Sequence, residues 1–186
     1  WDGAFDTDIT GVTALCDTLK TSSVTELGLA KCRLGPGSLG KLAEYVRDAE
    51  AAVARLILDG NPLTGVNGKF SHEIDKDITG LSALFDNLKT SSVTQLSVAK
   101  CQLGPRSVGK LAEYVRDADA ALNEVNVAFN QIGSEGGIAL RDALKTSNLK
   151  FLAIGKMYTS AGGVVITGSQ VTIGVTLSSG GRLGEL

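Results

Sequence analysis

The sequence predicts an α/β solenoid, an open horseshoe in which parallel strands line a concave face and helices lie on the convex side. The first observation behind this prediction is a duplication. Residues 8–61 align without a gap with residues 77–130, and 35 of these 54 positions are identical. A match of this length between two parts of one chain indicates a repeat array.

A shorter repeat lies inside the duplicated unit. The pattern L-x-L-x-x-(N/C)-x-L begins at Leu27, Leu56, Leu96 and Val125, and a weaker copy begins at Leu152. The spacings between these starts are 29, 40, 29 and 27 residues. Each start predicts a short strand, because apolar residues alternate there. The 40-residue step indicates an insertion near residues 65–76.

Helical patterns lie between the predicted strands. Apolar residues recur at the spacing of a helix in five segments: residues 9–19, 39–46, 78–88, 108–115 and 140–144. Pro36 and Pro105 stand where two of these helices can begin, since the first turn does not need their missing N–H. Each unit therefore consists of a strand, a turn, a helix and a second turn.

Stacking of these units explains the predicted curvature. A single unit cannot bury its own apolar face, so it must pack on its neighbours. Parallel strands stack about 4.8 Å apart, whereas packed helices need roughly 8–10 Å. The helices therefore take the outside of the curve, and the strands take the inside.

The pattern resembles the leucine-rich repeats of the ribonuclease-inhibitor-like class over about residues 8–156. The sixth position of the strand motif alternates between cysteine and asparagine, as in that class: Cys32, Asn61, Cys101 and Asn130. The resemblance implies that these four side chains form a structural ladder, pointing into the turn and satisfying backbone groups of adjacent repeats.

The resemblance divides the chain into two parts. Residues 1–156 are expected to form about five leucine-rich repeats, the first of them truncated, because "GAFDTDITG" resembles "SHEIDKDITG" and the chain therefore begins inside a repeat. Residues 157–186 lose the helical period and alternate apolar residues with Thr, Ser and Gly. We expect an irregular β-rich terminal repeat or cap there.

Composition excludes several classes of function. The chain has 186 residues, 43% of them hydrophobic, and a net charge of −2 without basic runs, so neither a nucleic acid nor a membrane is an expected partner. Its three cysteines lack CxxC spacing, which argues against a zinc site and favours a reducing, cytoplasmic setting. We expect no metal, no cofactor and no catalytic residue, and the single histidine, His72, is interpreted as a solvated loop residue.

One stretch leaves a nucleotide-binding alternative open. "GPGSLG" has the GxGxxG spacing at Gly35, Gly37 and Gly40, and Asp59 follows after the next predicted strand. The duplicated stretch, however, has Arg106 in place of the middle glycine. We therefore favour a structural interpretation, in which Gly35 and Gly104 allow a turn and Gly40 and Gly109 allow close approach of helices.

The leading hypothesis is a non-enzymatic module that binds a protein through the concave face. Side chains that alternate with the buried leucines should point out of that face. The candidate partner-binding residues are Glu26, Gly28, Lys31, Arg55, Ile57, Asp59, Gln95, Ser97, Lys100, Glu124, Asn126, Phe129, Phe151 and Lys156. Phe129 and Phe151 are either a binding hot spot or rings that pack on each other or on a cap. A structural subunit that self-associates through exposed end strands is the alternative function.

Overall fold

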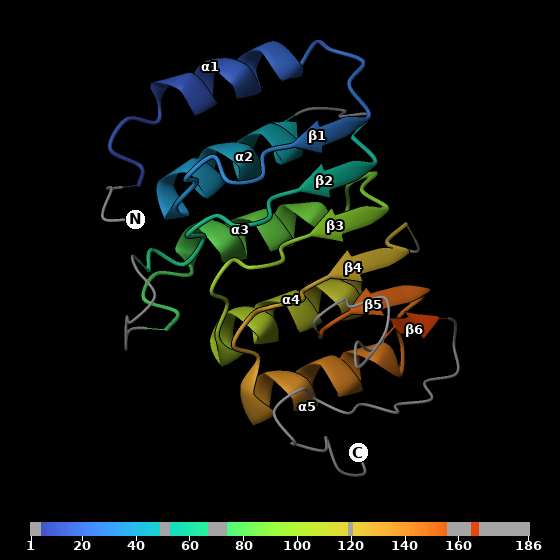
Figure 1. Ribbon diagram of the computed structural model, residues 1–186. Helices are drawn as coiled ribbons and strands as arrows, with labels where there is room; N and C mark the ends of the chain where they lie inside the picture. Colours follow the sequence, from blue (N-terminus) through green and yellow to red (C-terminus); the bar gives the residue numbers. More distant parts are fainter. Residues whose placement is uncertain (1–4, 49–52, 67–73, 119–120, 156–164, 168–186) are drawn as a thin grey trace.

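The computed structural model describes residues 5–48, 53–66, 74–118, 121–155 and the backbone of residues 165–167 (Figure 1). Five helices alternate with short strands. The helices are α1 (Thr10–Leu19), α2 (Pro36–Asp48), α3 (Thr79–Leu88), α4 (Pro105–Asp117) and α5 (Gly133–Leu144). The strands are β1 (Glu26–Gly28), β2 (Arg55–Ile57), β3 (Gln95–Ser97), β4 (Glu124–Asn126), β5 (Phe151–Ala153) and β6 (Val165–Thr167).

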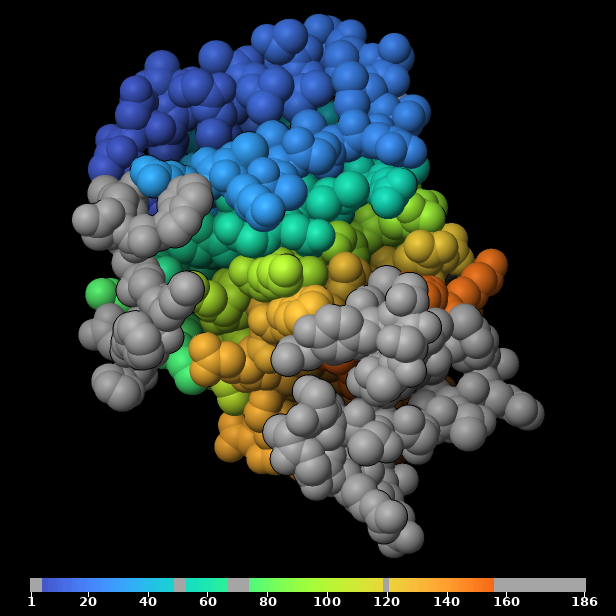
Figure 2. Space-filling model, in the orientation of Figure 1, coloured from blue at the N-terminus to red at the C-terminus, as the bar shows by residue number. Residues whose placement is uncertain are grey.

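The strands form one sheet in the order β1-β2-β3-β4-β5-β6, and β1 to β5 are all parallel. The five helices lie on one side of this sheet, and successive repeats form successive bands on the surface (Figures 1 and 2). The predicted α/β leucine-rich-repeat solenoid is therefore confirmed. We call the sheet face opposite the helices the concave face.

The described part of the tail ends the parallel series. Strand β6 pairs with β5 in the antiparallel direction, so that Phe151 lies opposite Thr167. A further repeat of the same kind would add a parallel strand instead, because the helix that connects two successive strands brings the chain back to start the next strand in the same direction. The rest of the predicted irregular cap, residues 157–164 and 168–186, lies outside the described residues.

One continuous core runs between the sheet and the helices. The central residue of each parallel strand points into it: Leu27, Leu56, Leu96, Val125 and Leu152, each no more than 8% exposed. Leucines from the helices fill the other side. The ring of Phe85 stacks on that of Tyr114, with centroids 5.8 Å apart. Burial therefore passes from repeat to repeat, as expected of units that lack a core of their own.

The asparagines of the predicted ladder join neighbouring repeats. The Asn61 side-chain nitrogen donates to Leu29 O at 2.8 Å and Leu58 O at 2.7 Å, and its oxygen accepts from Leu34 N at 3.1 Å. Asn130 donates in the same way to Val98 O and Val127 O, at 2.8 and 2.9 Å. Backbone groups that the turns would leave unpaired are thereby satisfied.

The two cysteines of the ladder differ. The buried Cys101 thiol donates to Leu58 O of the preceding repeat and to Ala99 O, both at 3.3 Å. Cys32 is exposed, and its thiol reaches only Ala30 O of its own turn, at 3.5 Å. The expectation that Cys32 satisfies an adjacent repeat does not hold, because no described strand precedes β1.

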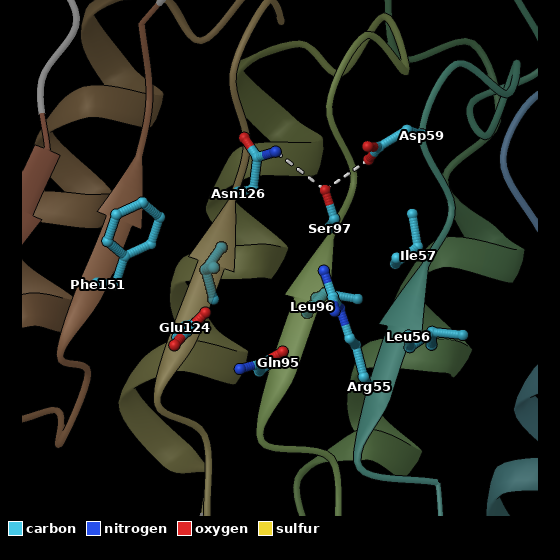
Figure 3. Close-up of a pocket in the computed structure, with 11 residues that line it drawn as sticks. Arg55, Leu56, Ile57, Asp59, Gln95, Leu96, Ser97, Glu124, Asn126 and Phe151 are labelled. Carbon is cyan, nitrogen blue, oxygen red and sulfur yellow. Dashed lines mark hydrogen bonds between the residues drawn. The ribbon is translucent and has the colours of Figure 1, made fainter. Parts of the chain in front are cut away.

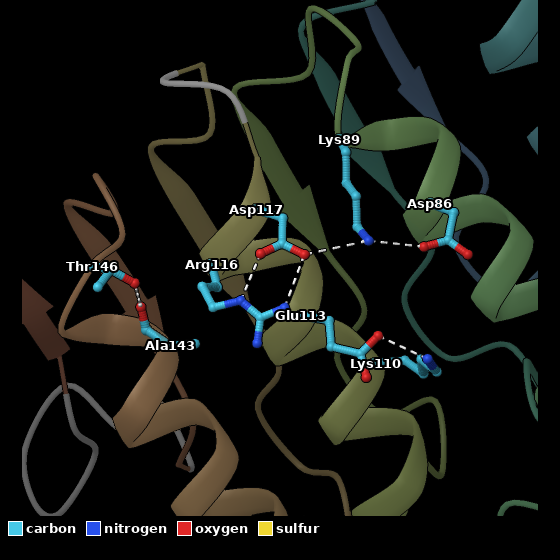
Figure 4. Close-up of polar contacts among 8 residues, drawn as sticks. All are labelled: Asp86, Lys89, Lys110, Glu113, Arg116, Asp117, Ala143 and Thr146. Atoms are coloured by element: carbon cyan, nitrogen blue, oxygen red, sulfur yellow. Dashed lines mark hydrogen bonds and ion pairs between the residues drawn. The ribbon is translucent and has the colours of Figure 1, made fainter.

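Ion pairs join exposed side chains of the helices (Figure 4). The Lys89 ammonium of α3 lies 3.0 Å from Asp86 and 3.5 Å from Asp117 of α4, and Asp117 also pairs with Arg116. Each of these side chains is at least a quarter exposed. Exposed ion pairs of this kind contribute roughly 0–1 kcal/mol each to the stability of a protein. The buried core and the ladder therefore stabilise the array far more than these ion pairs.

Candidate functional site: the concave face of the sheet

The concave face presents its side chains in rows that cross the strands. The parallel register places the first strand residues side by side: Glu26, Arg55, Gln95, Glu124 and Phe151. We call this set the first row. One ion pair joins two of its members, since Arg55 lies 3.9 Å from Glu26. Neither Gln95 nor Glu124 has a side-chain hydrogen bond or an ion pair to another residue in the described part of the chain.

A second row contains Gly28, Ile57, Ser97 and Asn126, and a hydrogen-bonded chain fixes its polar members. The Ser97 hydroxyl donates to Asp59 at 2.6 Å and accepts from the Asn126 amide at 3.0 Å (Figure 3). Asp59 also accepts from Ala99 N, at 2.8 Å. These three side chains are therefore held in place before any partner arrives, which lowers the entropy cost of binding.

A hollow opens between the two rows. It has an empty volume of about 620 Å³ and is open to solvent. The hollow brings together eight of the predicted binding residues, Arg55, Ile57, Asp59, Gln95, Ser97, Glu124, Asn126 and Phe151 (Figure 3). Leu56, Leu96 and Val125 also border it, but they are at most 2% exposed. The apolar surface of the hollow therefore comes from Ile57 and Phe151, among a few oriented polar groups, a combination typical of binding sites.

The remaining predicted residues lie outside the hollow. Glu26 and Gly28 belong to β1, at the edge of the sheet. Lys31, Lys100 and Phe129 each follow their strand by three residues and have left-handed backbone, with φ of 57°, 58° and 60°. Lys156 lies outside the described residues.

Phe129 stands out among these residues. Its side chain is 42% exposed, and the Lys100 ammonium lies over its ring at 4.7 Å from the centroid. No ring pair between Phe129 and Phe151 is present among the described residues, so the interpretation that these two rings pack on each other is not supported. A bulky side chain in the left-handed region costs roughly 1 kcal/mol or more. The Lys100 ammonium over the ring offsets part of this cost.

The glycine-rich loop that raised the nucleotide alternative already holds an anion. The Asp6 carboxylate accepts from the N–H groups of Gly35, Gly37 and Ser38, at 3.0, 2.6 and 3.2 Å, and from the Ser38 hydroxyl. These are the donors at the start of α2 that a phosphate would need. A side chain at Gly35 would collide with Phe5 and Asp6. The loop is built around a carboxylate of the protein itself.

The second copy of the loop repeats this arrangement. Asp75 is 3% exposed and accepts from the N–H groups of Gly104, Arg106 and Ser107 at the start of α4, and from the Ser107 hydroxyl. The sequence interpretation missed both aspartates. The signal was present, because Asp6 and Asp75 occupy matching positions in the stretches "FDTDITG" and "IDKDITG".

The roles predicted for the glycines of these loops need correction. Gly35 and Gly104 lack positive φ, and each instead makes room for the aspartate segment that packs on it. A side chain at Gly40 or Gly109 would meet nothing within 4 Å, so neither allows close helix approach. That role belongs to Gly80 of α3, where a side chain would collide with the Pro36 carbonyl of α2. The predictions failed because they followed the motif rather than the helix contacts.

Other chemistry finds little support in the described ranges. No group of three His, Cys, Asp or Glu side chains there could hold a metal ion. No helix of the described residues is long and apolar enough to cross a membrane. Burial raises the pKa of the Cys101 thiol to about 12 and also raises that of Cys16, which keeps both protonated and unreactive.

Comparison with known proteins agrees with the fold. Residues 121–140 match a family model described as a leucine-rich repeat. No curated protein sequence matches the chain. Among solved structures, the chain is similar to one titled "Leiomodin-1 Actin-Binding Site 2 (ABS2)", with a TM-score of 0.61 and 12% sequence identity. That match covers 82% of this chain and 81% of the other. The repeat motif and these similarities agree with the leucine-rich-repeat fold described above.

Proposed function

We propose that this protein is a non-enzymatic binding module that recognises a protein partner through its concave face. The observation that carries the proposal is the hollow, in which eight outward side chains of four adjacent strands surround one open volume. Phe129 and Phe151 add partly exposed aromatic surface, the kind that anchors protein interfaces. We also infer membership of the ribonuclease-inhibitor-like class, which the alternation of Cys32, Asn61, Cys101 and Asn130 supports.

The experiment compares variants on the two sides of the solenoid. Phe129→Ala and Phe151→Ala remove aromatic surface from the strand side. Ile138→Ala removes a comparably exposed apolar side chain, 46% exposed, from helix α5. Purified actin is the first partner to test, because the similar structure carries actin binding in its title. Captured proteins from a cell extract, identified and then purified, supply further candidates.

The expected result is a partner whose affinity falls about tenfold or more in the phenylalanine variants and stays unchanged in Ile138→Ala. Unfolding curves of each variant show that the fold survives. If every partner binds the phenylalanine variants as well as the original chain, binding does not use the concave face, and the proposal fails.

A second candidate function is assembly through the β1 end, and the duplication itself favours it. Helices α1 and α3 are copies, yet Leu84 of α3 is fully buried whereas its counterpart Leu15 is 38% exposed. Gly80 touches the α2 backbone, whereas its counterpart Gly11 meets nothing within 4 Å. The α1 surface has the side chains of a packed face without a described neighbour on it.

Light scattering after size exclusion tests this second function. Self-association through the β1 end predicts a mass that rises with concentration, and Leu15→Lys together with Val24→Lys should return it to that of a monomer. Because Leu15 and Val24 are 38% and 36% exposed, these changes should leave folding intact. A monomer at all concentrations would contradict it.

A further inference from the structure

Glu124 and Phe151 form a pair at the hollow in which the carboxylate lacks a polar partner among the described residues. The parallel register places the two residues side by side on β4 and β5. The Glu124 carboxylate is exposed and has no hydrogen bond or ion pair to a described residue, and the Phe151 ring is half-buried beside it. Figure 3 shows Glu124 between Phe151 and Gln95, at the rim of the hollow.

The electrostatics of this pair are the reverse of those at Phe129. There, the ammonium of Lys100, from the neighbouring repeat, covers the ring face. The face of an aromatic ring carries partial negative charge and attracts a cation. At Phe151 the neighbouring strand supplies a carboxylate instead of a cation. One bound cation would satisfy both the ring and the carboxylate.

The hollow as a whole is rich in hydrogen-bond acceptors. The residues that line it include one positive side chain, Arg55, and two negative ones, Asp59 and Glu124, so the formal charge of the lining is −1 (1 − 2). Arg55 already lies next to Glu26, 3.9 Å away. The Gln95 side chain beside Glu124 has no described partner. Lys150 precedes Phe151 in the chain, but no ion pair joins it to Glu124.

We propose that the hollow receives an arginine side chain of the protein partner, and this inference rests on the proposed function above. The guanidinium stacks on the Phe151 ring and donates two parallel hydrogen bonds to the Glu124 carboxylate, with the Gln95 amide oxygen as a further acceptor. Arginine fits better than lysine because its planar fork matches a carboxylate and stacks on a ring at the same time. The partner surface that binds this face is therefore basic at its point of contact with β4 and β5.

Nuclear magnetic resonance of the full ¹⁵N-labelled chain tests the inference without knowledge of the partner. The probe is N-acetyl-L-arginine amide, titrated at low ionic strength. The matched probe is N-acetyl-L-citrulline amide, which has nearly the same shape and no charge. The expected result is a concentration-dependent shift of the Gln95, Glu124 and Phe151 amide signals with the arginine probe, about tenfold weaker with citrulline.

Variants separate this site from general attraction of a cation. Glu124→Gln and Phe151→Ala should each weaken the arginine response several-fold. Glu135→Gln is the control with the same change of charge, because that exposed carboxylate lies in the first turn of α5, on the helix side of the solenoid, and it should leave the response unchanged. An equal response to citrulline or to N-acetyl-L-lysine amide, or an unchanged response in Glu124→Gln, would overturn the inference.

The outcome is distinguishable from that of the proposed function. If a protein partner loses affinity in Phe129→Ala while the arginine probe produces no shift, only the arginine inference fails. If the probe binds at Glu124 but no partner depends on the concave face, the proposed function fails, and so does the assignment of this arginine to a protein.

Discussion

Asp75 and Ser107, 32 residues apart in the chain, form a buried hydrogen-bonded pair at the start of helix α4. The same carboxylate accepts from three backbone N–H groups of that helix start. Asp6 and Ser38 repeat the pair at the start of α2, where Asp6 is half-buried. The insertion before α3 thus has a structural task, which is to cap the helix of the following repeat.

This pair predicts that Asp75→Ala destabilises the protein by about 2–4 kcal/mol, because it leaves several buried donors without an acceptor. Asp6→Ala is the matched variant, and it should cost about 1–2 kcal/mol, since water can reach its site more easily. Urea unfolding monitored by circular dichroism measures both. A larger loss in Asp6→Ala than in Asp75→Ala would show that burial does not set the cost.

The duplicated glycines of α1 and α3 give a second prediction, in which the same substitution has opposite signs. Gly80→Ala forces a side chain into the Pro36 carbonyl and should cost about 3 kcal/mol or prevent folding. Gly11→Ala meets open space within a helix and should stabilise by about 0.5–1 kcal/mol. Thermal unfolding of the two variants against the original chain checks both signs.

Reactivity of the cysteines gives a third prediction. Cys16 and Cys101 are buried and Cys32 is exposed. The raised pKa of the two buried thiols keeps them protonated, whereas the thiolate is the reactive form. A thiol reagent such as Ellman's should therefore modify one cysteine rapidly in the native protein and all three in denaturant. Loss of the rapid phase in Cys32→Ser would assign it, and its persistence would contradict the assignment.

Acid should weaken the start of helix α3. The hydroxyl and the N–H of Thr79 donate to the Asp77 carboxylate and hold the pKa of that group below its ordinary value of 3.8. The folded state therefore gains stability from ionised Asp77 above the pKa of the unfolded chain, and loses it as the pH falls through the lowered native value. Because Asp77 is exposed, the gain is only about 0.5 kcal/mol.

Comparison with Asp77→Asn isolates this contribution. The original chain should be more stable than the variant near neutral pH, and the difference should shrink as the pH falls through the lowered native pKa of Asp77 and the carboxylate becomes protonated. Urea midpoints measured along this acid series follow the difference. A gap that stays constant with pH would contradict the assignment.

Periodicity predicted the architecture because the features behind it are local. The leucines at Leu27, Leu56 and Leu96 recur in register, and each central strand residue is buried as expected. The outward-pointing residues that line the hollow could be predicted for the same reason, because they alternate along each strand with the buried residues. What a local pattern cannot contain is contact between segments far apart, so the Asp75 cap and the Gly80 contact were missed, and Cys32 lacked the neighbour that its motif implied.

The capped start of α4 also has a consequence for the timing of local opening. First-turn amides of a helix normally exchange with solvent at once, since no intrahelical acceptor holds them. The amides of Gly104, Arg106 and Ser107 are held by a buried carboxylate from another segment, so they can exchange only when that segment lifts away. Helix α5, which has no side-chain cap, should release its first amides far sooner.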